Sequence, residues 1–150
     1  MIGETKDMDY LMGMIYNKEN AGIKCDDNAK YTYTNEQLKF TIQCENNSQC
    51  YLKSENIIVG MLGEVYDAQA DKLEHIYEKY CSSGIEHIQA MNGFYTVIII
   101  DLNINKLYIV QDCRTSFEHL YFCENKGILY FSTSLKWLLD TSKIKRLDFH

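Results

Sequence analysis

The sequence predicts a β-rich α+β domain in which antiparallel sheets stack on each other and a few helices lie outside them. Short runs rich in Tyr, Ile, Val and Phe recur between turn signals such as NKENAG, ENNSQ and ENKG, which is typical of strands. One segment near the middle of the chain has the apolar spacing of an amphipathic helix. Together these features favour layered sheets with helices on the outer faces.

The expected strands follow one another closely, and some of their pairings can be predicted. The alternating segment YTYTNEQLKFTIQ is typical of a hairpin with one solvated face. FYTVIIID is apolar on both faces, as in a central strand, and KLYIV and GILYFS follow it across short turns as a meander. The expected strands are 10–16, 31–34, 37–43, 49–53, 56–62, 94–101, 106–111, 119–123 and 127–132.

The main helix is expected over 68–80, with Asp67 as its N-cap. Four residues of this segment fall at i, i+3, i+4 and i+7 and form one apolar face. They are Leu73, Ile76, Tyr77 and Tyr80. Gly84 should end this helix or start a short second one, and a third helix over 134–140 should begin after Thr133 as its N-cap.

Composition and charge argue against several classes of function. The 150 residues carry a net charge of −6 and show no basic stripe, so nucleic-acid binding is not expected. The opening MIGETKDMDY is not a secretory signal, and the longest aliphatic runs are far too short to span a membrane. The six cysteines include no C-x-x-C pair, so we expect reduced thiols, no metal site and a cytoplasmic protein without a membrane partner.

Four segments in order resemble one family. They are GEVYD at 63–67, NGFYTVIIID at 92–101, LYIVQDCRTSFEHLYF at 107–122 and GILYFSTSLKWLL at 127–139. Their order and spacing are similar to the glutaminase domain of class II glutamine amidotransferases of the asparagine-synthetase type. The matching residues are Gly63, Glu64, Val65, Tyr66, Asn92, Gly93, Asp101, Asp112, Leu120, Tyr121, Phe131, Leu135 and Lys136. The resemblance implies an Ntn-hydrolase-like αββα sandwich of two antiparallel sheets with few flanking helices.

The residues that glutaminase chemistry needs are missing. In this family an N-terminal cysteine attacks the glutamine amide, and its own α-amino group acts as base. Here residue 2 is Ile2, and the expected first strand contains no cysteine. Leu62 replaces the asparagine that stabilises the oxyanion in the family, and a leucine side chain donates no hydrogen bond. The family's Arg-Gly-Pro-Asp loop needs a proline, which the chain lacks, and in its Ser-Asp-x-Glu segment Asp71 is the only carboxylate and is out of register.

These losses predict a degenerate pocket made of Leu62, Gly63, Glu64 and Asp71, with no catalytic residue. Glu64 ends an apolar strand, and three readings stay open for it: a relic hydrogen-bonded to backbone near the old pocket, a retained ligand contact, or exposure to solvent. Three further residues are candidates for contact with a partner domain, and a solvated turn is the alternative for the first two. They are Asp112, Arg114 and Lys136.

The predicted function is a catalytically inactive glutaminase-like domain over 1–140, with 141–150 as a tail or a linker toward a missing synthetase domain. β-Lactam synthetases and lasso-peptide cyclases resemble this arrangement, so the parent would be an ATP-dependent amide-forming protein. The expected partner is a synthetase domain or a protein or peptide, and no cofactor is expected. Two alternatives stay open: a stand-alone protein that binds a small ligand in the old pocket, and an amide hydrolase with a cryptic nucleophile such as Cys25 freed by processing.

Overall fold

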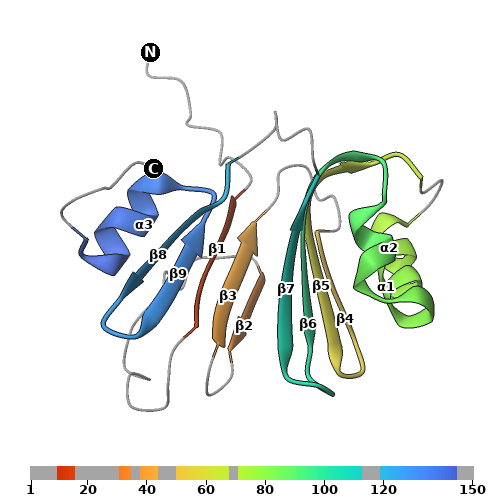
Figure 1. The fold of residues 1–150 in the computed structure, drawn as a ribbon, viewed down its shortest axis with the longest axis horizontal. Helices are drawn as coiled ribbons and strands as arrows, with labels where there is room; N and C mark the ends of the chain where they lie inside the picture. The colour runs from red at the N-terminus through yellow and green to blue at the C-terminus, as the bar shows by residue number, and fades with distance from the viewer. Residues whose placement is uncertain are drawn as a thin grey trace. The chain divides into compact units, whose positions relative to one another are not determined.

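The computed structural model describes residues 10–15, 31–34, 38–43, 50–67, 71–112 and 119–144, which form two antiparallel sheets and three helices (Figure 1). The chain divides into two compact units. One unit takes Met1–Gln43 and Leu120–His150 from the two ends of the chain, and the other takes Cys44–His119 from its middle. The protein is therefore a mixed α and β structure with an antiparallel sheet in each unit, as the sequence predicted at that level.

The middle unit contains a four-stranded sheet in the order β4-β5-β6-β7. Its strands are β4 Tyr51–Ser54, β5 Ile57–Val65, β6 Gly93–Asp101 and β7 Lys106–Gln111. The sequence predicted β6 as a central strand, and this is confirmed: β6 pairs with β5 and β7, and its residues from Tyr95 onward are buried on both faces. β5 continues past its predicted end at 62, which brings Gly63 and Glu64 into the ladder.

Helices α1 Lys72–Ser83 and α2 Ile85–Gln89 connect β5 to β6 and cover one face of this sheet (Figure 1). Alternate residues of the strands meet the apolar faces of the two helices there, as the period of two in a strand requires. The buried members of this cluster are Ile57, Val59, Met61, Val65, Leu73, Ile76, Ile88, Met91, Tyr95, Val97, Ile99 and Val110, with Tyr77 and Tyr80 packed against them. The predicted apolar face of the main helix is thus confirmed.

The start of α1 differs from the prediction. Asp71, and not Asp67, is the N-cap, because its side chain accepts hydrogen bonds from the backbone N–H groups of Leu73 and Glu74 at 3.0 and 3.2 Å. Gly84 both ends α1 and precedes α2, with φ of +80°, so the two alternatives predicted for this glycine hold together.

The other unit contains a five-stranded sheet in the order β2-β3-β1-β9-β8. Its strands are β1 Tyr10–Ile15, β2 Tyr31–Thr34, β3 Leu38–Gln43, β8 Tyr121–Asn125 and β9 Ile128–Ser132. β2 and β3 pair as the predicted hairpin. The predicted meander is wrong in its last step: β9, which contains GILYFS, pairs with β1 and β8 in this sheet, and not with β7.

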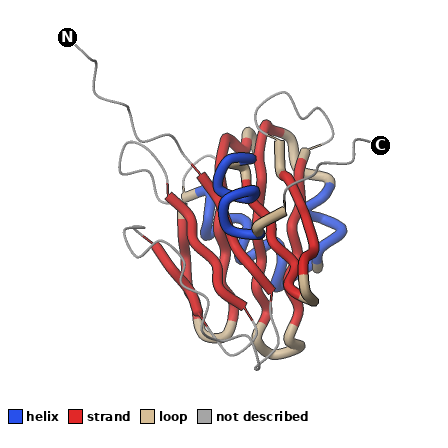
Figure 2. Tube along the Cα trace, turned by 90° about the vertical axis from the view of Figure 1, so that its left-hand side faces the viewer, coloured by secondary structure: helices blue, strands red, loops and turns tan. Residues whose placement is uncertain are grey.

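Helix α3 Leu135–Ser142 lies against β8 and β9 (Figure 2). Its Leu138 packs with Met14, Ile128 and Tyr130. The predicted N-cap is displaced by one residue, because the Ser134 hydroxyl accepts the N–H of Trp137 at 3.3 Å. Thr133 instead joins α3 to the first strand: its hydroxyl accepts the N–H of Leu11 at 3.1 Å.

Cys50 departs from the expectation that the thiols stay reduced. It is 2% exposed and disulfide-bonded, whereas Cys81 and Cys123 are free. A disulfide requires two Cα atoms within about 7 Å, and spacing along the chain does not reveal that proximity. Among the described residues, no helix combines the length and apolar character needed to cross a membrane.

Candidate functional site

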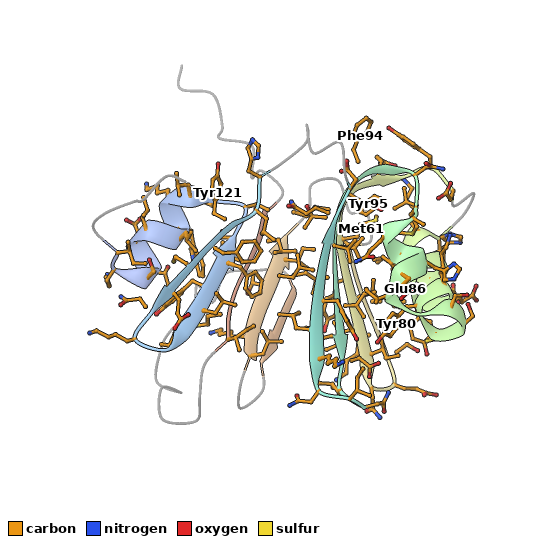
Figure 3. All side chains as sticks on the ribbon, viewed as in Figure 1. Met61, Tyr80, Glu86, Phe94, Tyr95 and Tyr121 are labelled. Atoms are coloured by element: carbon orange, nitrogen blue, oxygen red, sulfur yellow. The ribbon has the colours of Figure 1, made fainter. Side chains whose placement is uncertain are left out.

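The C-terminal end of β5 and the start of β6 approach each other more closely than side chains allow. A Cβ atom on Gly63 would lie 2.0 Å from the carbonyl oxygen of Phe94, and one on Gly93 would lie 2.1 Å from that of Glu64. Both glycines have positive φ angles, +94° and +153°. Two of the segments that resemble glutaminases therefore meet through their glycines, beside the labelled Phe94 and Tyr95 (Figure 3).

Leu62 lies just before this crossing and is 1% exposed. The alternation of β5 places it on the face opposite Met61, away from the helices. Its side chain is a buried aliphatic group with no polar atom. At this position the strand offers a ligand neither a side-chain donor nor an acceptor.

Glu64 is exposed, which is the third of the readings predicted for it, and the favoured reading of a carboxylate hydrogen-bonded to backbone is wrong. Its side chain is 61% exposed and forms an ion pair with the ammonium group of Lys72, the first residue of α1. The strand alternation that buries Leu62 does not bury Glu64, because β5 has reached its end and the chain turns away toward the helix. An exposed carboxylate with a cationic neighbour has no burial cost to offset.

Asp67 and Asp71 both serve the local backbone. Asp67 accepts hydrogen bonds from the backbone N–H and the side-chain amide of Asn92, at 2.8 and 3.2 Å. The backbone hydrogen bond from Asn92 is the main cause that lowers the pKa of Asp67, and the side-chain bond adds to it. The N–H of Tyr66 also donates to the carbonyl of Asn92 at 2.8 Å. GEVYD and NGFYTVIIID are thus held together by these bonds, while Asp71 caps α1.

Asp112 is buried, so the prediction of a solvated turn is wrong for this residue. It is 7% exposed, and its carboxylate accepts the backbone N–H of Tyr95 at 2.9 Å. The Tyr95 hydroxyl in turn donates to the carbonyls of Ile88 and Met91, each at 3.1 Å. Asp112 therefore fixes the start of β6, and Tyr95 on that strand holds the end of α2 and the residues just after it.

The other predicted residues are not brought into this site. Lys136 is exposed on α3, in the other unit. Arg114 and Cys25 lie outside the described residues. Of the predicted pocket residues, Leu62, Gly63 and Glu64 follow one another near the end of β5, and Asp71 lies at the start of α1.

The described side chains at this strand end offer charged and aromatic groups. Glu64, Asp67 and Lys72 carry charge, and each has a partner within the chain. Tyr66 is 62% exposed and its ring meets that of Phe94 edge to face, with centroids 5.9 Å apart. These residues include no thiol and no aliphatic hydroxyl that could act as a nucleophile.

Comparison with known proteins gives one distant similarity. No protein-family model matches the chain. It is 27% identical over 110 residues to a glutamine-hydrolysing asparagine synthetase of Bacillus subtilis (strain 168). The match covers 62% of this chain but only 14% of that much longer protein. The similarity supports a distant glutamine amidotransferase-like relationship, in the direction that the sequence motifs indicated.

The sequence identified Asp101 and Asp112 as matching residues but did not predict that their carboxylates are buried. Asp112 follows β7 directly and Asp101 ends β6, and both are 7% exposed. An aspartate at the end of an apolar strand such as VIIID is a recognisable signal, because such a carboxylate needs hydrogen-bond donors when the strand is buried. Which donors meet it depends on the packing.

Proposed function

We propose that this chain is a catalytically inactive glutaminase-like domain of an asparagine-synthetase-like, ATP-dependent amide-forming system, with a structural role or a role in docking a partner or substrate. The proposal includes the finer fold assignment, an Ntn-hydrolase-like αββα sandwich. The distant similarity to an asparagine synthetase and the presence of two antiparallel sheets support it.

The observation that carries the proposal is the state of Leu62. The resemblance assigns this position to the side chain that stabilises the oxyanion, and here a buried aliphatic group occupies it. Removing one such donor lowers the rate of hydrolases by on the order of 10²–10³. Glu64 forms an ion pair with Lys72, so its carboxylate already has a cationic partner within the chain.

Without glutaminase activity, the role we propose for this domain is to support a partner structurally or to bind it through its surface. The partner we propose is a synthetase domain, or a protein or peptide that such a domain acts on. Lys136, which is exposed on α3, is the residue whose substitution should be tested for an effect on docking, whereas Asp112 is buried. A cytoplasmic location is part of the proposal. Because the cytosol keeps most thiols reduced, the redox state of Cys50 in cells, which is disulfide-bonded in the structure, tests this location directly.

The test of inactivity is the intact mass of the purified chain before and after incubation with a glutamine-like diazoketone, which alkylates amidotransferase cysteines, together with ammonia release from glutamine. We expect the full-length mass, no specific adduct and no ammonia above a buffer blank. Cys81→Ser is the matched control, because Cys81 is exposed and free and can react without any active site. A chain shortened to begin at Cys25, or a stoichiometric adduct that persists in Cys81→Ser and requires the glutamine-like part of the reagent, would overturn the proposal.

A further inference from the structure

A pocket lies on the sheet face that α1 and α2 cover, at the end of the sheet away from Glu64. It has a volume of about 390 Å³, within the range of roughly 300–1,000 Å³ usual for small-molecule sites. All of its lining residues belong to the middle unit: Ile57, Tyr80, Cys81, Gly84, Ile85, Asp101 and Tyr108. Figure 3 shows Tyr80 between the helices and the strands of this unit.

The polar centre of the pocket is the carboxylate of Asp101, at the end of β6. It is 7% exposed. One oxygen accepts the hydroxyl of Tyr80 at 2.7 Å, and the other accepts the backbone N–H of Asn103 at 3.0 Å. A carboxylate offers about four acceptor positions, so capacity is left for a further donor. Among the described residues, no Lys, Arg or His forms an ion pair with Asp101.

The surroundings of Asp101 favour a positive charge. The last turn of α1 contributes Tyr80 and Cys81 to the pocket, and that turn contains no basic residue to complement the negative end of the helix dipole. The rings of Tyr80 and Tyr108 lie with centroids 6.0 Å apart, and both residues line the pocket together with Asp101, so a cation there would have aromatic neighbours. Burial is the main cause that raises the pKa of Tyr80, and the bond to Asp101 adds to it, so this phenol stays a neutral donor.

The nearest candidate for an internal counter-charge is Lys106. It is the cross-strand partner of Asp101 between β6 and β7, so both side chains leave the same face of the sheet. Lys106 is nevertheless exposed, and it makes no ion pair with Asp101. The position for a cation next to Asp101 is therefore left to a ligand.

We propose that this pocket binds a small primary amine: its ammonium group donates to Asp101 and faces the rings of Tyr80 and Tyr108, while Ile57 and Ile85 contact its apolar body. The ammonium supplies the donor that the free acceptor positions of Asp101 lack, and a charge-assisted hydrogen bond of this kind is about twice as strong as a neutral one. The site is separate from the strand end that contains Leu62 and Glu64, so it does not depend on the proposed function.

The test compares three probes of the same shape on the full chain at neutral pH: isopentylamine, isopentanol and isovalerate. Binding is followed by calorimetric titration and by the rate at which iodoacetamide alkylates Cys81, measured by peptide mass mapping. We expect the amine alone to bind and to slow the alkylation of Cys81, while Cys123 reacts at an unchanged rate. Equal binding of the alcohol, or no binding of the amine at millimolar concentration, would overturn the proposal.

Two variants assign the effect to the carboxylate. Asp101→Asn keeps the shape and an acceptor for Tyr80 but removes the charge, and it should weaken amine binding by roughly tenfold or more, the factor that a hydrogen bond to a charged group contributes. Asp140→Asn, at an exposed aspartate on α3 in the other unit, is the matched control and should leave binding unchanged. Circular dichroism establishes that each variant is folded, and equal binding by folded Asp101→Asn would refute the role of Asp101.

Two further experiments distinguish a free amine from the Lys106 side chain and from a lysine of another protein as the source of the ammonium group. Lys106→Met should leave amine binding intact or strengthen it, since it removes a competing cation. If Lys106→Met instead creates binding that the parent chain lacks, Lys106 is the occupant and the proposal is wrong. N-acetyl-lysine methylamide presents the same ammonium on a peptide-like body, and tighter binding of isopentylamine than of this compound identifies a free amine rather than a lysine side chain as the ligand.

Discussion

Gly63, near the end of β5, offers a direct test of whether the glycine of the GEVYD segment is required by the backbone or by a ligand. In Gly63→Ala the new methyl group would lie 2.0 Å from the carbonyl oxygen of Phe94, a backbone atom that cannot rotate away. The φ angle of +94° adds strain, because L-residues rarely adopt it. The variant should therefore lose stability through two separate effects.

The two effects can be sized separately. Holding a non-glycine residue in such a conformation costs about 1–3 kcal/mol. Forcing extra atoms into a packed contact costs a further 1–3 kcal/mol or so. The sum is a large part of the roughly 5–15 kcal/mol by which a domain is stable. Gly84→Ala is the matched control in the same unit: its φ is +80°, but nothing lies within 4 Å of its added Cβ.

The measurement is urea unfolding followed by far-ultraviolet circular dichroism for the parent chain and both variants. Gly63→Ala should be less stable than Gly84→Ala by about 1–3 kcal/mol, the part due to the steric contact. In a chain of this length that difference corresponds to a fall in Tm of about 2–4 °C per kcal/mol. If the two variants are equally stable, the close approach of β5 and β6 does not explain the glycine, and a ligand becomes the better explanation.

Two further predictions concern the bonds that hold β6. Tyr95→Phe removes a buried hydroxyl that shares its proton between the carbonyl of Ile88 in α2 and that of Met91 after it, and it should lower the free energy of unfolding by about 1–3 kcal/mol. Tyr77→Phe, whose ring packs against the same cluster, should change it by less than about 0.5 kcal/mol in the same urea assay. Asp67 has a lowered pKa in the folded state, so its contribution to stability is full above its unfolded pKa of about 3.9 and is lost as the pH falls through the folded value. Asp67→Asn should therefore be less stable than the parent near neutral pH, and the two urea midpoints should approach each other as the pH falls through the lowered pKa of Asp67. A difference independent of pH would contradict the assignment to the Asn92 bonds.

The positions of the strands follow from the sequence because their signal is local. Each run of β-branched and aromatic residues between turn residues became a strand within a few positions of the predicted limits, including the hairpin of β2 and β3 and the buried strand β6. The apolar face of α1 was equally readable, since Leu73 and Ile76 are spaced by the helical period.

The candidate site was predicted only in its backbone part. The motif glycines and Leu62 were identified, and Leu62 is buried in the structure. The burial and the partners of the carboxylates were not predicted. Glu64 proved exposed and paired with Lys72, whereas Asp112 proved buried under Tyr95. A carboxylate's surroundings come from segments far away in the chain, so its own neighbours in sequence carry little information about them.

The same division separates what the sequence by itself determined from what only the tertiary structure decided. Local periodicity determined which segments are strands and helices, and four short motifs carried the resemblance that predicts an inactive glutaminase-like domain. The tertiary structure decided which sheet each strand joins: β9 pairs with β1, more than a hundred residues away, and not with the nearby β7. It also decided that Asp71 rather than Asp67 caps α1, because Asn92 engages Asp67. These outcomes depend on contacts between distant segments, which form only when the whole unit packs.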